Sequence, residues 1–264
     1  MRIPDKITKK TVLKIIWIVY ALVSMVVWVP QIDKMFIKDY ASDTAYLSLD
    51  DGWDITVGSE VYRDVSLGDF RFGPVRKGDR ITMQKTLPGH FGLMEGVLRF
   101  HIRQSAVQMY IDGEPVYEYG YDRMAQNKTV GSGFQFINFP NRYQGKTLEI
   151  SLFLSEDLAF TKLDSVRIYE WEDAYRMLLT ENRIPLFFGC FLAVFGLVIN
   201  IITVFALAVS LKYIRAFCIS LFSFLMGLWT LCYYNVILIF SMPLYAVSLL
   251  EYLTLYLAPV PLII

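Results

Sequence analysis

Two runs of alternating apolar and polar residues meet at an Asp-Gly pair in the stretch Ala106-Val-Gln-Met-Tyr-Ile-Asp-Gly-Glu-Pro-Val-Tyr-Glu-Tyr-Gly120. Alternation with a period of two places successive side chains on opposite faces of a β-strand. Asp-Gly at the join favours a tight two-residue turn, because glycine readily takes the positive φ angles that such turns need. The stretch therefore predicts an antiparallel hairpin with Val107, Met109 and Ile111 on its apolar face.

The segments on either side of this hairpin carry the same alternation. Apolar residues alternate with basic or imidazole residues from Leu98 to Arg103, and with polar or aromatic residues from Leu148 to Leu154. Weaker strand patterns cover residues 53–57, 80–86, 133–139 and 165–169. Several short strands separated by turns are typical of antiparallel sandwiches. We expect a β-sandwich within residues 31–170.

Long apolar segments flank this β-rich region. Residues 12–29 are long enough to cross a bilayer core of about 30 Å, too long for a cleaved signal peptide, and lack a small-residue cleavage site. Further apolar segments cover residues 184–211, 216–240 and 244–264, and residues 171–183 predict a connecting helix leading directly into the second span. The sequence thus predicts a membrane protein of the α plus all-β class. Its expected parts are a tail and first helix (1–30), the sandwich (31–170), the connecting helix (171–183) and membrane helices 2–4 (184–264).

Basic residues predict how these segments cross the membrane. They lie before the first span, at Arg2, Lys6, Lys9 and Lys10, and between the second and third spans, at Lys212 and Arg215. Because basic loops are retained in the cytoplasm, we expect a multi-pass protein of the cell membrane with a cytoplasmic N-terminus. Residues 31–183 are then extracytoplasmic. The fourth apolar segment reaches Ile264 without a basic cluster, so we expect the intact protein to continue beyond this chain.

The composition excludes several classes of protein. Of the 264 residues, 55% are hydrophobic and only 19% are charged, which is unlike an ordinary soluble domain. The 25 basic and 25 acidic residues give a net charge of zero, so nucleic-acid binding is not expected. All three cysteines lie in the apolar second half, and the β-rich region must fold without disulfides. With only two histidines, we expect no metal site and no cofactor.

No sequence pattern predicts catalysis. The chain contains no Gly-x-Ser-x-Gly, phosphate-binding, His-Glu-x-x-His or dinucleotide-binding motif. Glu156-Asp157 supplies the residue types of a glycosidase, but acidic pairs are common on loops. We therefore expect no enzymatic activity from this chain.

Arg99, His101 and Arg103 form the first candidate ligand-binding group, because they share the polar face of one predicted strand. Arginine offers planar donors suited to carboxylate or phosphate, so the row suits an anionic or sugar ligand. The alternative is a solvated sheet face or a contact with the membrane helices.

The second candidate group is Tyr117, Tyr119 and Tyr121, followed by Asp122 and Arg123. Aromatic rings along one strand edge, next to polar groups, suit carbohydrate recognition. Ordinary cross-strand packing is the alternative.

Three polar residues lie within the apolar segments. Asn200 and Asn235 predict hydrogen bonds between membrane helices. Glu251 is costly in hydrocarbon, which indicates a relay or a structural or signal-coupling hydrogen bond. Its position only about two helical turns into the fourth segment also allows ordinary placement near the outer interface.

The stretch Ala106–Gly120 resembles the central hairpin of galactose-binding-like jelly-roll domains, and Gly145-Lys-Thr-Leu-Glu-Ile-Ser-Leu152 resembles their closing strand. The whole arrangement resembles bacterial seven-transmembrane signalling receptors. It is most similar to the input half of membrane-bound GGDEF-type diguanylate cyclases of Gram-positive bacteria, in which stretches like 103–107, 131–133, 155–157 and 251–256 recur. The chain departs from that pattern by lacking the remaining helices and a Gly-Gly-Asp-Glu-Phe motif, so cyclase activity is not expected here.

This resemblance implies a receptor input module that senses an extracellular ligand or partner and relays the event to a cytoplasmic output domain. The alternative is a cell-surface or transport-associated binding protein with no signalling output. The expected partners are membrane lipid, an extracellular carbohydrate or small molecule, and a second copy of the chain.

Overall fold

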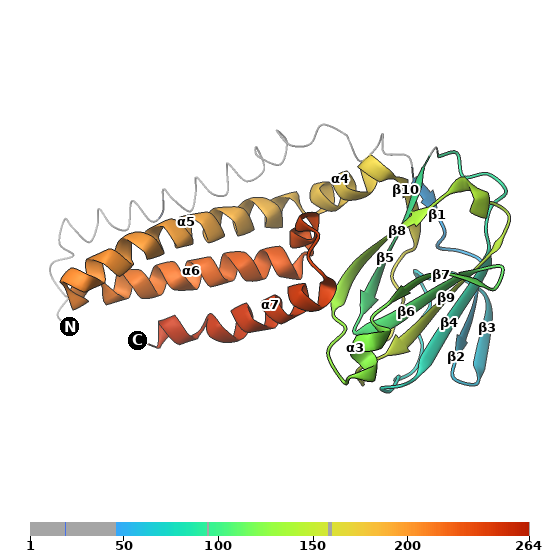
Figure 1. Ribbon diagram of the computed structural model, residues 1–264, viewed down its shortest axis with the longest axis horizontal. Coiled ribbons are helices and arrows are strands. Elements are labelled where there is room, and N and C mark those ends of the chain that lie inside the picture. The colour runs from blue at the N-terminus through green and yellow to red at the C-terminus, as the bar shows by residue number, and fades with distance from the viewer. Residues whose placement is uncertain (1–18, 20–45, 94, 158–159, 264) are drawn as a thin grey trace, which may run out of the picture. The chain divides into compact units, whose positions relative to one another are not determined.

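A computed structural model of the chain describes Val19 and residues 46–93, 95–157 and 160–263. The predicted first span over residues 12–29 lies outside this part, apart from Val19. From Thr44 to Ile264 the chain forms one compact unit that contains both strands and helices (Figure 1).

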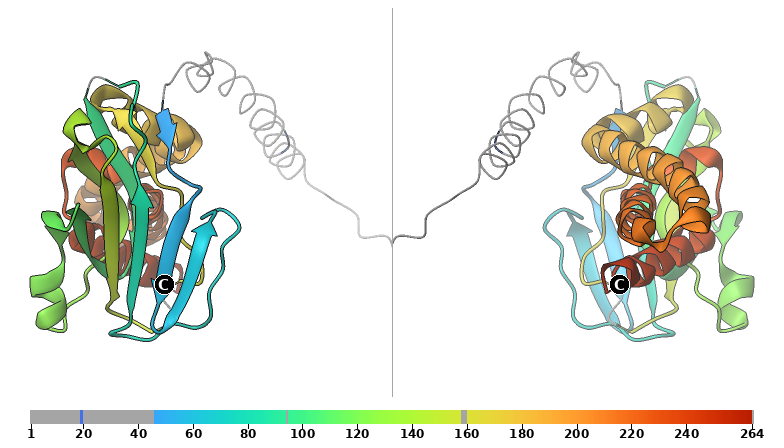
Figure 2. Two further views of the ribbon diagram at one scale, coloured as in Figure 1. Left: turned by 90° about the vertical axis from the view of Figure 1, so that its right-hand side faces the viewer. Right: turned by 90° about the vertical axis from the view of Figure 1, so that its left-hand side faces the viewer.

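Ten strands form two antiparallel sheets. The four-stranded sheet has the order β1 (Tyr46–Ser48), β10 (Arg167–Glu170), β5 (Gly96–Arg103) and β8 (Ser132–Phe139). The six-stranded sheet has the order β3 (Glu60–Val65), β2 (Trp53–Val57), β4 (Arg80–Thr86), β9 (Thr147–Leu154), β6 (Ser105–Ile111) and β7 (Glu114–Tyr119). Seen from the side of the sheets, the long helices lie behind them (Figure 2). The prediction of an antiparallel β-sandwich is confirmed at this level.

The Asp-Gly hairpin is confirmed in detail. β6 ends at Ile111 and β7 begins at Glu114, so Asp112 and Gly113 alone form the turn. Both have positive φ angles, 51° and 83°, as a tight turn matching the twist of the strands requires. The register pairs Ile111 with Glu114.

One apolar core joins the inner faces of the two sheets. Leu98, Phe100 and Ile102 of β5 are almost fully buried, and so are Leu148, Ile150, Leu152 and Leu154 of β9. Trp53 of β2 is also completely buried in this core. The predicted inward stripes are thus where the alternation placed them.

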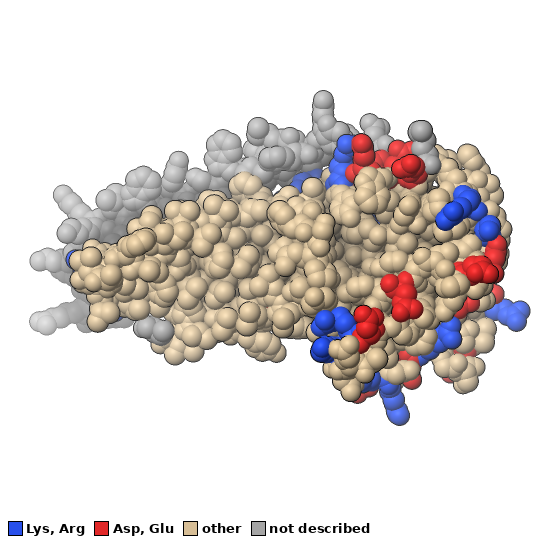
Figure 3. Space-filling model, viewed as in Figure 1, with Lys and Arg blue, Asp and Glu red and all other residues tan. Residues whose placement is uncertain are grey.

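The longer helices follow the strands in sequence. They are α4 (Trp171–Glu181), α5 (Arg183–Val209), α6 (Ile214–Tyr233) and α7 (Leu244–Leu257). The short 3-10 turn η2 (Leu211–Tyr213) lies between α5 and α6, η3 (Val236–Phe240) lies between α6 and α7, and η4 (Val260–Leu262) follows α7. Three helical stretches, Arg183–Val209, Leu211–Tyr233 and Leu244–Leu262, are long and apolar enough to cross a membrane. On the face drawn in Figure 3, charged side chains gather over the sandwich and are sparse over the long helices. Such apolar exposure suits lipid contact.

The third apolar segment is shorter as a helix than expected. We expected it to run to Phe240, but α6 ends at Tyr233. Asn235 and Ser241 both take the left-handed conformation, with φ angles of 59° and 55°. That conformation cannot continue a right-handed helix, so residues 236–240 form a separate turn before α7.

The expected connecting helix is broken from the second span. α4 ends at Glu181, and Asn182 has φ −113° and ψ 23° before α5 begins at Arg183. Pro185 explains the break, because proline has no N–H to donate to the carbonyl four residues earlier. The expected connecting helix is therefore present and leads into the span, but the two helices are not continuous, and Asn182 lies at the joint between them.

Small residues bring α5 and α6 into backbone contact. A Cβ atom added to Gly196 would lie 2.5 Å from the Phe224 nitrogen, and one added to Gly227 would lie 2.3 Å from the Ala193 nitrogen. Glycine is needed at both positions because any side chain would force the helices apart.

Candidate functional site

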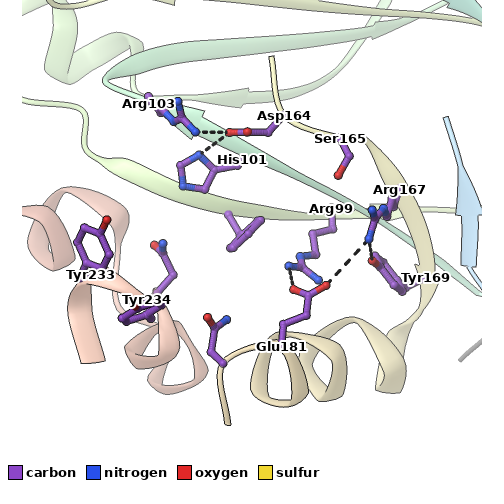
Figure 4. Close-up of a pocket in the computed structure, with 13 residues that line it drawn as sticks. Arg99, His101, Arg103, Asp164, Ser165, Arg167, Tyr169, Glu181, Tyr233 and Tyr234 are labelled. Carbon is purple, nitrogen blue, oxygen red and sulfur yellow. Dashed lines mark hydrogen bonds and ion pairs between the residues drawn. The ribbon is translucent and has the colours of Figure 1, made fainter. Parts of the chain in front are cut away.

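A cavity of about 400 Å³ lies between the outer face of the four-stranded sheet and the neighbouring helix ends (Figure 4). Arg99, His101 and Arg103 of β5 line it, together with Phe134 of β8 and, at and before β10, Asp164, Ser165, Arg167 and Tyr169. The helical side is formed by Glu181, Asn182, Tyr233, Tyr234 and Asn235. The cavity is thus shared between the sandwich and the helices, and is within the usual size of small-molecule sites.

Arg99 is the most enclosed charged residue of the cavity, with only 5% of its surface exposed. Its Nη2 donates to Oε2 of Glu181 at the end of α4. Its guanidinium carbon lies 4.2 Å from the centre of the Phe134 ring and 5.6 Å from that of Tyr169, so aromatic rings stabilise the charge. Nε and Nη1 are buried without a hydrogen-bond partner.

Arg167 of β10 lies close to the same carboxylate. Its Nη1 is 4.0 Å from Oε1 of Glu181 and 3.4 Å from the Tyr169 hydroxyl. Arg167 Nε is also buried without a hydrogen-bond partner. Two guanidinium groups therefore share one carboxylate, and dashed lines join Glu181 to both of them in Figure 4.

Asp164 holds the other two basic residues of the cavity. Its Oδ2 accepts from Arg103 Nη2 at 2.9 Å and lies 3.3 Å from Nδ1 of His101. Burial raises the pKa of Asp164, but the nearby imidazole of His101 and the charges of Arg103 and Lys162 outweigh burial and leave that pKa below its usual value. Asp164 is therefore a stable anion, and its negative charge compensates the positive charge of Arg103 on one side of the cavity.

The predicted row on β5 is brought together, but it is not a solvated sheet face. Arg99 is buried against α4 and Phe134, and the ring of His101 packs edge-on against Phe134 with centres 5.0 Å apart. Arg99 contacts Glu181 of the connecting helix α4 rather than one of the membrane helices. Ligand binding by this row stays a prediction.

The tyrosine group does not form an aromatic platform. The Tyr117 hydroxyl donates to Gln135 and that of Tyr119 to the Val130 carbonyl, and burial raises the pKa of Tyr117 to about 12. Tyr121 is not on the strand as expected, because Gly120 with φ 84° ends β7 and Tyr121 begins α3 (Tyr121–Ala125).

The two charged residues after these tyrosines are also apart from the cavity. Asp122 is exposed. Arg123 donates to the Thr129 carbonyl and lies 3.6 Å from the centre of the Tyr245 ring. The described cavity contains neither of them, and ligand binding by the second candidate group stays a prediction.

The loop before β8 contacts the first turn of α7. A Cβ added to Gly131 would lie 2.6 Å from the Leu244 carbonyl, and the Ser132 N–H donates to the Ser248 hydroxyl at 2.9 Å. A Cβ added to Gly133 would lie 2.5 Å from Oδ1 of Asn235. We call residues 131–133 and the α7 residues they contact the β8–α7 seam.

The polar residues of the apolar segments have different surroundings from those expected. Asn235 is outside α6 and lines the cavity, where its Oδ1 is buried without a hydrogen-bond partner. Asn200 donates to the Gly196 carbonyl of its own helix at 3.3 Å, so the bond runs within α5. Glu251 is half-buried about two turns into α7, and its role stays a prediction.

Sequence reasoning missed Asp164, Arg167 and Glu181. Arg167 lies in one of the weaker predicted strands, and Glu181 lies in the short helix, 82 positions from Arg99. No local pattern links such distant residues. Within the described part of the chain, no cluster of His, Cys, Asp and Glu residues is arranged to hold a metal ion.

Comparisons with known proteins give little beyond this geometry. No family model and no curated protein matches the chain. A β-D-mannosidase from Dictyoglomus thermophilum is similar over 48% of this chain and 23% of its own, with 12% identity and a TM-score of 0.33. A GH31 α-xylosidase from Xanthomonas citri is similar over 52% of this chain and 20% of its own, with 8% identity and a TM-score of 0.22. Likenesses this weak carry no inference about activity.

Proposed function

We propose that the chain is the input part of a membrane signalling receptor of the bacterial seven-transmembrane type, with a jelly-roll sandwich that binds a ligand outside the cell membrane. The observation that carries the proposal is the cavity, because the sandwich and the helix ends line it together. A ligand that contacts both can favour one arrangement of the sheet and helices over another. The protein would bind its ligand without transforming it.

The charge distribution supports the proposed orientation. Lys212 and Arg215 lie at η2 and the start of α6, whereas the cavity contains Asn182 and Tyr233 from the opposite ends of α5 and α6 (Figure 1). If the helices span a membrane, the basic turn and the sandwich are on opposite sides. This agrees with a cytoplasmic basic loop and extracytoplasmic residues 31–183.

Two sets of contacts would carry the event to the helices. The first joins Arg99 to Glu181, one residue before the joint at Asn182. The second is the β8–α7 seam, where the Ser132 N–H donates to Ser248. In the alternative, a binding protein without output, neither set of contacts has to change when a ligand occupies the cavity.

The test measures whether an occupied cavity changes the helices. In the full chain in lipid nanodiscs, Ser165→Cys would carry a disulfide adduct of 3-mercaptopropionate or of its uncharged amide, in a Cys190→Ser background. Ser165 lines the cavity, and Cys190 is the exposed native thiol. The same adducts on Thr161→Cys, an exposed position outside the described cavity, serve as the control.

Hydrogen exchange is then compared between labelled and unlabelled protein. We expect at least one adduct on Ser165→Cys to change amide exchange at residues 178–186 or 235–247, with no such change for Thr161→Cys. Exchange that changes only within the sandwich for both adducts would favour the binding protein without output.

A further inference from the structure

The cavity carries an uncompensated positive charge. Arg99, Arg103 and Arg167 contribute three positive charges, and Asp164 and Glu181 contribute two negative ones, which leaves one positive charge when His101 is neutral. Asp164 is matched with Arg103. Among the lining residues the excess therefore lies on Arg99 and Arg167, which share Glu181, and Asp50 outside the lining also acts on Arg167.

The same pair of arginines has unused donors. Nε and Nη1 of Arg99 and Nε of Arg167 are buried without a hydrogen-bond partner. Arg99 is more than nine-tenths buried, and unpaired donors of a buried charged group are costly. A hydrogen-bond acceptor that enters beside these groups would remove that cost.

Glu181 is weakly suited to its position. It is the last residue of α4, where the carbonyl ends of the helix repel a carboxylate. A third of its side chain is exposed, whereas Arg99 is enclosed. The arginines, rather than the helix, hold Glu181 in place, so another carboxylate can compete for them.

We infer that the cavity binds a small monocarboxylate, and that the ligand carboxylate replaces Glu181 at Arg99 and Arg167. This inference rests on the proposed function, since it names the ligand class and the switch at the same cavity. The excess positive charge favours an anionic ligand, and guanidinium donors match a planar carboxylate. The rings of Phe134, Tyr233 and Tyr234 line the space left for the apolar or sugar-like remainder.

Displacement of Glu181 has a structural result. The ion pair from Arg99 joins β5 to the end of α4, next to the joint at Asn182. Once Glu181 is released, the last turn of α4 loses its tie to the sheet. Glu181 thus acts as an internal ligand that holds the unliganded arrangement.

The test compares an acid with its isosteric amide at the same place. Ser165→Cys in the full chain is equilibrated with equal amounts of 3-mercaptopropionate and 3-mercaptopropionamide in a thiol–disulfide buffer, and the adducts are counted by mass spectrometry. Thr161→Cys corrects for the intrinsic difference between the two thiols. We expect the acid to be favoured on Ser165→Cys, and Glu181→Gln to increase this preference by about tenfold, roughly the worth of a charge-assisted hydrogen bond in a shielded site.

A double variant separates competition from a general change in charge. If Glu181 competes with the ligand for Arg99, the increase in acid preference seen with Glu181→Gln should disappear in the double variant Arg99→Gln/Glu181→Gln. The reason is that the two substitutions then act on one interaction. Neutralising both partners of the ion pair also spares the fold an unpaired buried charge. In the Ser165→Cys protein with Glu181 intact, the acid adduct should speed exchange at residues 178–181 more than the amide does.

Several results would overturn the inference. Equal acid and amide adducts on Ser165→Cys would refute the ligand class, and a gain that persists in the double variant would refute displacement of Glu181. These outcomes differ from failure of the proposed function. If the acid is preferred but amide exchange in the helices does not change, the anion site is supported and the proposed coupling to the helices is refuted. If the acid and the amide form equal amounts of adduct and both change exchange in the helices, the coupling is supported and the anion site is refuted.

Discussion

Replacing Gly131 with alanine should undock the sandwich from α7 without unfolding either. Gly131 has a φ angle of 94°, and an added Cβ would lie 2.6 Å from the carbonyl carbon and oxygen of Leu244 and from the Tyr245 nitrogen. Those are backbone atoms, so no side-chain rotation relieves the clash. Gly78 is a matched control, because its φ is 90° and an added Cβ would meet nothing within 4 Å.

The magnitude follows from the difference between the two sites. Alanine with a left-handed φ costs about 1–2 kcal/mol at either position. Only Gly131→Ala adds overpacking, which costs about 1–3 kcal/mol. If that cost falls on the β8–α7 seam, the equilibrium between docked and undocked forms shifts by about 5- to 150-fold.

The assay is amide exchange at Ser132, whose N–H donates to the Ser248 hydroxyl at 2.9 Å. We expect Gly131→Ala to speed exchange at Ser132 by a factor in that range, while strand β9 stays protected. Gly78→Ala should leave Ser132 unchanged. Equal protection of Ser132 in the two variants would refute the reasoning that the seam is held by close backbone contact at Gly131.

Three further outcomes are expected. Leu152→Ala should lower the free energy of unfolding by about 2–5 kcal/mol, because Leu152 is 3% exposed in the core and a cavity adds to the lost burial; chemical denaturation of the full chain checks this, and a loss below about 1 kcal/mol would contradict the core assignment. The pKa of Asp164 is lowered in the folded protein, so its stabilisation is present above the unfolded pKa of about 4 and is lost as pH falls through the folded value. Melting temperatures between about pH 6 and pH 3 should therefore fall less for Asp164→Asn than for the parent. A cysteine at Lys212 should resist an impermeant maleimide added to intact cells while a cysteine at Asp122 reacts, and labelling at Lys212 would disprove the proposed topology.

Local patterns account for most of the fold. The Asp112-Gly113 turn has the positive φ angles that its residue types predicted, and alternation in β5 and β9 identified the buried stripes. These features are predictable because neighbouring residues alone decide them. Helix ends were less predictable, since the left-handed Asn235 ends an apolar run that composition alone extends to Phe240.

The site was predictable only in part. The row Arg99, His101 and Arg103 was recognised because its members lie on one face of one strand. Glu181 and Asp164, which complete it, come from distant segments, and their carboxylates meet the row only after the sheet and helices pack. Tyr121 was misplaced for a local reason, because Gly120 with φ 84° ends the strand one residue earlier.

The backbone contact between α5 and α6 limits how the helices can move. Gly196 and Gly227 leave no room for either helix to slide or turn past the other, since even a Cβ atom would meet the opposite backbone. A displacement that begins at Asn182 must therefore carry α6 with it, including Tyr233 at its end. The joint at Asn182 and the turn at Asn235 would then shift in concert, so the two routes from the sandwich into the helices amount to one mechanical degree of freedom.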